Sequence, residues 1–203
     1  MRKQPSQQRS QHMVGILVEA SGRVVAREGL ANFSTNKVAA EAGVSIGSLY
    51  QYFADKNGLL DALLNQMLNE LKTLIDAHLQ QLLKSDIRSA VVVLLRAVLA
   101  FMQHGDQRYL QLARHWQQLQ THHVVDELEK HLLETCRRYL LDHMQTLPIK
   151  AAYPVLFVSV NSVLMTLIRY LSVPNPPLSE EELVDSLADM LAAYLNWAAV
   201  EGG

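Results

Sequence analysis

The chain has 203 residues, 49% of them hydrophobic, so it can bury a core of ordinary size. Its single cysteine, Cys136, excludes an intrachain disulfide. The polar first residues lack the apolar stretch of a signal peptide, and no run reaches the roughly 18 apolar residues of a membrane span. The net charge is −2, but residues 1–56 hold seven basic and four acidic side chains (+3) and the remainder eleven and sixteen (−5). This asymmetry favours phosphate contacts at one end only, and we expect a soluble cytoplasmic protein.

Apolar residues recur with helical spacing along nearly the whole chain, and no segment has a convincing strand pattern. The first predicted helix ends at Gly29, and its buried face comprises Met13, Ile16, Leu17, Ala20 and Val24. Gly15 and Gly22 lie inside this helix and should each weaken it by about 1 kcal/mol relative to alanine. Close packing is the only reason that the sequence suggests for them.

Residues 34–53 read STNKVAAEAGVSIGSLYQYF, which is the pattern of a helix-turn-helix. Two helices too short to be stable alone are capped by Ser34 or Thr35 and by Ser45, and a turn that begins at Gly43 joins them. The second helix, expected over residues 46–53, exposes a glycine, two hydroxyls and an amide. Such a surface suits the major groove of DNA. A small helical bundle with a glycine corner is the alternative for the turn taken alone.

The remainder of the chain continues the helical pattern. A long fourth helix, which Asp55 can cap, is followed by helices near residues 86–103, 107–120, 124–146, 151–171 and 179–200. Ser179 and three following glutamates form a strong start for the last one. The sequence therefore predicts an all-α protein of about nine helices: a flexible basic arm at 1–8, a three-helix head at 9–69, and a helical bundle at 70–203 that the long helix joins to the head.

Residues 9–65 resemble the DNA-binding head of the TetR family of bacterial regulators. That head usually reads T-x-x-I-A-x-x-A-G-V-S-x-G-x-L-Y-x-Y-F-x-x-K, which this chain follows from Thr35 to Lys56. The departures are Val38 for the usual isoleucine, and Ala54 and Asp55 where Pro-Ser or Pro-Asn is commoner.

The resemblance implies that the head binds double-stranded DNA. The side chains that would contact phosphates are Thr35, Ser48, Tyr50 and Lys56. Bases would be read by Ser45, Ile46, Gly47 and Gln51, with Asn36 and Lys37 as further candidates. Gln51 is the best candidate for direct readout, because an amide can bond N6 and N7 of adenine together.

The resemblance also implies a homodimer that forms through the last two helices. The interface residues expected there are Tyr153, Phe157, Leu164, Leu187, Leu191 and Tyr194. The alternative is that these side chains form the core of one protomer. Because one short helix reads too few bases, two heads would bind a palindromic operator with half-sites about 34–36 Å apart.

The domain at 70–203 is further expected to enclose an effector pocket between its helices. The candidate lining residues are Phe101, Met102, His115, Trp116, Cys136, Tyr139, Asn161 and Met165, each of which is individually more common as plain core. Few charges lie on the inward faces, which predicts a largely apolar or aromatic effector with one or two hydrogen-bonding groups. Its binding would swing the long helix and release the heads from DNA. Repression is the commoner mode of the family, and activation is the alternative.

An enzyme is the rival class. His123, Glu127 and His131 share one helix face and could ligate a metal, but the spacing is not that of HExxH, and a solvated polar face is the favoured interpretation. Cys136 lacks the sequence signature of a nucleophile. We therefore expect no catalytic residue, metal or cofactor. The remaining alternative is an all-helical small-molecule carrier or adaptor that keeps the fold without binding DNA.

Overall fold

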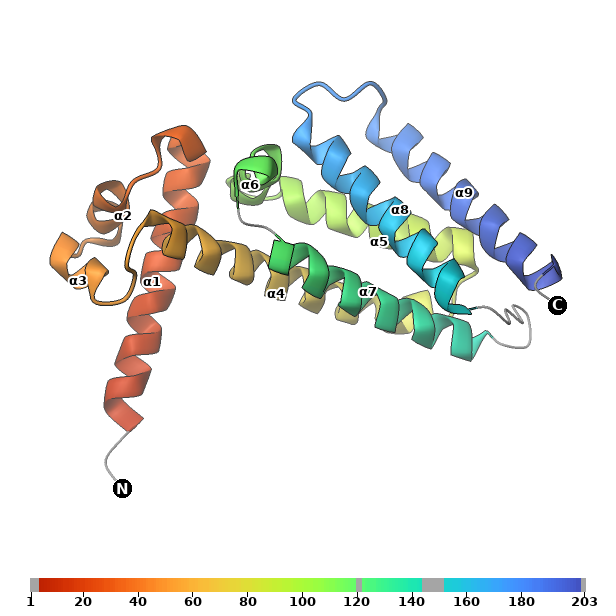
Figure 1. Ribbon diagram of the computed structural model, residues 1–203, viewed down its shortest axis with the longest axis horizontal. Helices are drawn as coiled ribbons and strands as arrows, with labels where there is room; N and C mark the ends of the chain where they lie inside the picture. The colour runs from red at the N-terminus through yellow and green to blue at the C-terminus, as the bar shows by residue number, and fades with distance from the viewer. Residues whose placement is uncertain (1–3, 120–121, 144–151, 202–203) are drawn as a thin grey trace. The chain divides into compact units, whose positions relative to one another are not determined.

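A computed structural model describes residues 4–119, 122–143 and 152–201 of the chain. These residues form nine α-helices, two short 3-10 segments and no β-strand, which confirms the all-α prediction (Figure 1). The α-helices are α1 (Gln4–Glu28), α2 (Thr35–Ala42), α3 (Ile46–Tyr50), α4 (Lys56–Leu82), α5 (Ile87–Gln103), α6 (Arg108–Arg114), α7 (His122–Asp142), α8 (Ala152–Ser172) and α9 (Glu180–Glu201). The 3-10 segments are η1 (Leu30–Asn32) and η2 (Trp116–Gln118).

The helices gather into two compact units. The first comprises Met1–Met67 and Met102–Thr121, and the second comprises Leu68–Phe101 and His122–Gly203. The chain passes from one unit to the other inside α4, close to the predicted domain boundary after residue 69. The sequence did not predict that residues 102–121 join the amino-terminal unit. The functional division into a DNA-binding and a regulatory domain stays a prediction.

Caps and glycine turns fix the short helices of the first unit. Ser34 accepts a hydrogen bond from the Lys37 amide (3.4 Å), and Ser45 accepts one from the Ser48 amide (3.1 Å). Gly43 ends α2 in the left-handed conformation, with φ of 69°, which a glycine adopts without steric cost. These caps confirm the predicted helix starts. α3 is shorter than predicted and ends at Tyr50, because the backbone then leaves the helix through a turn.

Two further boundaries differ from the predictions. α1 begins at Gln4, so residues 4–8 are helical although they were expected in a flexible arm, and Pro5 lies in the first turn, where proline is tolerated. Residues 1–3 of that arm lie outside the described residues. The helix expected over 107–120 is broken after α6, because His115 leaves helical geometry while its ring contacts the Gln111 carbonyl (3.0 Å).

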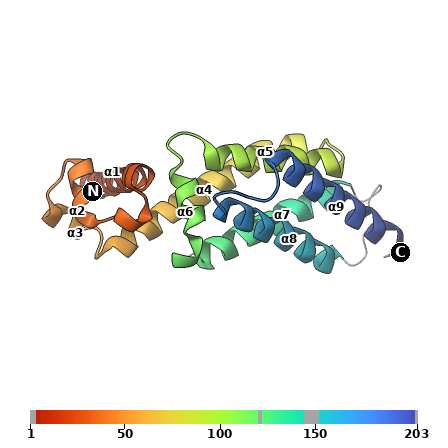
Figure 2. The same cartoon turned by 90° about the horizontal axis from the view of Figure 1, so that it is seen from above.

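The second unit is built around α8, whose neighbours α7 and α9 lie beside it in both views (Figures 1 and 2). α8 is long and apolar enough to cross a membrane, a property that core helices of soluble proteins share. One face of α8 is buried in this unit: Val155, Leu156, Ser159, Val160, Leu164, Leu167 and Leu171. α9 begins with a capping box, in which Ser179 and Glu182 each accept a hydrogen bond from the other's backbone amide.

Candidate nucleic-acid interface and effector cavity

The exposed face of α3 carries most of the residues predicted to touch DNA. Leu49 faces inward and is fully buried, whereas Tyr50 is 52% exposed and Ile46 is 37% exposed. Around them Ser45, Gly47 and Gln51 are also exposed. A Cβ atom at Gly47 would meet only the Ser45 hydroxyl, at 3.9 Å. The helix therefore presents an open, nearly uncharged surface that another molecule could approach closely.

The hydroxyl groups of this surface are held by one another. Thr35 Oγ1 and Tyr50 Oη lie 3.2 Å apart, which joins the start of α2 to the end of α3. Ser45 Oγ and Ser48 Oγ lie 2.9 Å apart within the first turn of α3. Four residues that were predicted individually to contact DNA are thus brought together in two pairs, and each hydroxyl retains capacity for another hydrogen bond.

The three remaining predicted polar residues, Asn36, Lys37 and Lys56, have different surroundings. Lys56 begins α4, and both it and Asn36 are exposed. Lys37, in contrast, is paired with Glu28, and this contact is the main reason that the pKa of Glu28 lies below its usual value. Lys37 would therefore have to leave an existing partner in order to contact a base.

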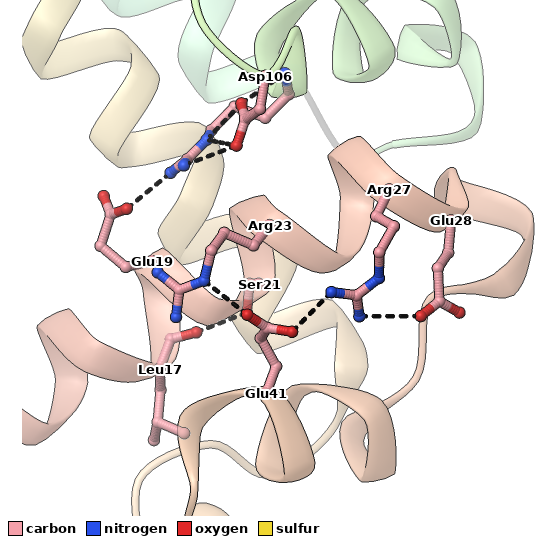
Figure 3. Close-up of polar contacts among 9 residues, drawn as sticks. Leu17, Glu19, Ser21, Arg23, Arg27, Glu28, Glu41 and Asp106 are labelled. Atoms are coloured by element: carbon pink, nitrogen blue, oxygen red, sulfur yellow. Dashed lines mark hydrogen bonds and ion pairs between the residues drawn. The ribbon is translucent and has the colours of Figure 1, made fainter.

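Ion pairs fasten α2, which precedes the turn, to α1. Arg23 Nε donates to Glu41 at 2.7 Å, and Arg27 Nη1 donates to the other carboxylate oxygen at 2.8 Å (Figure 3). The hydrogen bonds from Arg27 and then Arg23 hold the pKa of Glu41 below its usual value. The four-residue spacing of the two arginines was a signal for a shared partner on one helix face, but the sequence did not identify that partner.

Arg108, which sequence reasoning missed, ties α6 to α1. Its Nη1 donates to Glu19 at 2.8 Å, and its Nε and Nη2 donate to the two carboxylate oxygens of Asp106 at 2.9 and 2.8 Å (Figure 3). The hydrogen bonds to Asp106 are the main reason that the pKa of the guanidinium is raised. The side chain lies against Gly22, where an added Cβ would be 2.5 Å from Nη1. This contact explains the buried glycine inside α1.

The second unit contains an apolar cavity of about 110 Å³. Its walls come from α4, α5, α7, α8 and α9, and two of the predicted pocket residues, Cys136 and Tyr139, line it. The other six predicted residues lie outside the lining. Met102, His115 and Trp116 belong to the first unit, and Asn161 instead donates to Glu129 at 2.8 Å. Met165 is exposed and Phe101 does not reach the cavity.

On α7, two of the residues considered as metal ligands have other partners. Glu127 contacts Lys72 at 3.0 Å, and His131 Nε2 lies 3.2 Å from Asp76, so both side chains face α4. The residues that the structure describes contain no group of three potential metal ligands. The absence of a metal, a cofactor and a catalytic residue stays a prediction.

The predicted dimer residues differ in exposure. Leu164, Leu187 and Leu191 are buried within the protomer, Tyr194 is half-buried, and only Tyr153 and Phe157 are exposed. The apolar side chains that the structure leaves exposed nearby are Val158 and Met165 on α8 and Met190, Trp197 and Val200 on α9. On α9, positions 190, 197 and 200 share one face, because they are seven and three residues apart.

Comparison with known proteins agrees with this geometry. The family model of bacterial regulatory proteins of the tetR family matches residues 17–63. Over 129 residues the chain is 31% identical to the HTH-type transcriptional regulator BetI of Vibrio campbellii, covering 64% of this chain and 63% of the relative. It is 37% identical over 73 residues to BetI of Yersinia pseudotuberculosis, covering 36% and 37%. The match thus spans less than two thirds of the length of these relatives.

Residues 17–63 of this chain are therefore similar to bacterial regulatory proteins of the tetR family.

Solved TetR-family structures share the fold. One from Mesorhizobium loti superposes with a TM-score of 0.69 at 16% identity, covering 92% of this chain and 96% of that one. The structure of RolR with resorcinol gives 0.65 at 19% identity, covering 95% of both chains. In this chain the matched residues 17–63 contain every residue that was predicted to contact DNA. They also contain Glu41, which joins α2 to α1, and Gly22, against which the Arg108 side chain lies.

Proposed function

We propose that this protein is a transcription regulator that binds double-stranded DNA through α3. The observation that carries the proposal is the exposed face of α3, which offers a glycine, hydroxyls and an amide and is flanked by the exposed Lys56. The short helix is preformed, because Ser45 caps it and Tyr50 is tethered to Thr35. Gln51 reads a base, while the hydroxyls and Lys56 contact phosphates. The similarity of residues 17–63 to the tetR family model and the transcriptional regulators among the relatives support the same function.

The DNA-bound form that we propose is a homodimer on a palindromic operator. The support is the exposed apolar set on α8 and α9, in which Tyr153 is 71% exposed and Trp197 is 54% exposed. Large side chains of this kind on adjacent helices are typical of an association surface. Two copies related by a twofold axis place two α3 helices on half-sites of opposite orientation, about 34–36 Å apart.

We further propose that a small, largely apolar effector regulates this cytoplasmic protein, with repression as the mode. The apolar cavity of the second unit supports this step, since it lies between helices and no charged side chain among the described residues lines it. The effector must bind the form that does not bind DNA more tightly than the DNA-bound form, by a few kcal/mol, in order to release the operator.

Selection from randomised duplex DNA tests the proposal. Wild-type protein should enrich a palindrome, and Tyr50→Ala should enrich it weakly. Tyr170→Ala is a matched control, because Tyr170 lies on α8 in the second unit and plays no part in the proposed contact. Folded wild-type protein that enriches no sequence at low salt would overturn the proposal and favour a small-molecule carrier that retains the fold.

A further inference from the structure

The walls of the cavity in the second unit restrict the chemistry of a ligand more closely than its apolar character alone. None of the described residues that line it is charged, and most are leucine, valine, isoleucine or alanine. A charged ligand would lose its hydration without gaining a counterion there. The walls therefore exclude carboxylates and ammonium ions and admit neutral molecules.

Four lining residues carry a heteroatom in their side chains: Thr135, Cys136, Tyr139 and Ser159. Thr135 Oγ1 already donates to the His131 carbonyl (2.9 Å), and Tyr139 Oη donates to the Ser85 carbonyl (2.9 Å). Burial raises the pKa of the Cys136 thiol to about 11, so it stays neutral and is at most a weak hydrogen-bonding group. These three groups offer a ligand little further pairing.

Ser159 is the exception. Its side chain is buried (7% exposed), and its Oγ has no hydrogen-bond partner among the described residues. A buried hydroxyl without a partner is unfavourable, because it has lost its contacts with water. Ser159 lies on α8 and lines the cavity, but its Oγ is itself covered, so a ligand there would supply the missing partner only after the serine side chain rotates.

The volume sets the size of the ligand. An apolar cavity of about 150 Å³ accepts benzene. The cavity here measures about 110 Å³, and its wall consists largely of flexible aliphatic side chains. By this comparison one six-membered ring is the upper limit, and a ring with one small substituent, roughly seven non-hydrogen atoms, would enter only if the aliphatic side chains of the wall move apart.

We propose that the cavity binds a small neutral molecule, of the size of one ring, whose single hydrogen-bonding group pairs with Ser159. This inference rests on the proposed function only in treating the ligand as the effector. Phenol and toluene are the matched probes, because they have the same size and differ by a hydroxyl in place of a methyl group.

The test is calorimetric titration of the full chain without DNA, using phenol, toluene, benzoate and benzylammonium. Wild-type protein should bind phenol about tenfold more tightly than toluene and should bind neither ion. Ser159→Ala should reduce the preference for phenol to about twofold or less, since one neutral hydrogen bond is worth up to about tenfold in affinity. Thr135→Val is the matched control and should keep the preference, because the Thr135 hydroxyl is already paired.

Val91→Phe locates the site, because it fills the cavity from a half-buried position on α5 and should abolish binding of both probes. Thermal unfolding checks that each variant folds. Equal affinity of the wild type for phenol and toluene, binding of benzoate, or unchanged binding by Val91→Phe would overturn the proposal, and none of these results depends on Ser159→Ala. Release of a selected operator by phenol is measured separately. Binding of phenol without release contradicts its role as an effector and leaves the ligand class standing.

Discussion

Replacing Gly22 by alanine tests whether Arg108 is the reason for the glycine inside α1. A Cβ atom at residue 22 would lie 2.5 Å from Nη1 of Arg108 and 2.8 Å from its Cδ and Cζ, which is closer than such atoms approach in proteins. The arginine would have to move away from Glu19 and Asp106. Its side chain is only 18% exposed, so the movement also withdraws its packed methylene groups.

Two opposing effects set the magnitude. Alanine is favoured over glycine by about 1 kcal/mol in a helix interior. The charge-assisted hydrogen bonds of Arg108 to two partly exposed carboxylates are worth on the order of 2 kcal/mol together, after solvent screening. We therefore expect Gly22→Ala to lower the free energy of unfolding by roughly 1 kcal/mol. Gly15→Ala is the matched control and should raise it by about 1 kcal/mol, because a Cβ at residue 15 meets no atom within 4 Å.

Urea unfolding followed by circular dichroism, at one protein concentration, measures both changes. In an Arg108→Ala background the obstruction is gone, and Gly22→Ala should then stabilise the chain by about 1 kcal/mol, as Gly15→Ala does. If both alanines stabilise the chain equally while Arg108 is present, the close contact does not restrain α1 and the reasoning is refuted.

Four further outcomes are expected. Tyr50→Phe, which removes the hydroxyl that contacts α2, should weaken operator binding about tenfold in a gel-shift assay with little change in stability; unchanged affinity would contradict the contact. The hydrogen bond from Arg108 lowers the pKa of Glu19, so the stabilisation from the ionised Glu19 is present above pH 4.5 and is lost as the pH falls through the folded pKa. Glu19→Gln should therefore be less stable at pH 7, and its free energy of unfolding should change less with pH on the acid side. An unaltered pH profile would contradict this. Trp197→Glu should sediment as a monomer, whereas Leu141→Glu, at a residue of similar exposure, should sediment as a dimer. A dimer in both variants would refute the interface. Cys136 is partly buried and its pKa is raised to about 11 by desolvation, so at pH 8 it should react with a thiol reagent much more slowly than an ordinary exposed cysteine, and rapid modification of the folded protein would contradict the raised pKa.

Local signals in the sequence predicted the first unit well. The caps at Ser34 and Ser45 and the left-handed glycine at Gly43 depend on a few neighbouring residues, and all three are present in the structure. The exposed face of α3 follows directly, because Leu49 alone in that helix is buried. Helix starts and faces of this kind are set by short-range chemistry, which periodicity and capping residues reveal.

Contacts between distant segments could not be predicted in the same way. From the sequence alone, Gly22 only destabilises α1 and has no explanation. The fold places Arg108, 86 positions later in the chain, against Gly22. For the same reason only two of the eight predicted pocket residues, Cys136 and Tyr139, line the observed cavity. Met102 and His115 were expected beside Cys136, but residues 102–121 belong to the first unit. Helical periodicity shows that a side chain is buried without showing which cavity or core it faces.

The salt dependence of operator binding tests the central claim most directly. Each phosphate contact adds about −0.9 to the slope of log affinity against log salt, so a dimer that loses two Lys56 contacts should have a slope shallower by about 2. Lys84→Ala is the matched control, because Lys84 is exposed in the second unit and should leave the slope unchanged. The account predicts steep salt dependence in the wild type and a shallower slope in Lys56→Ala alone. Binding that is insensitive to salt, or equal slopes in all three proteins, would contradict it.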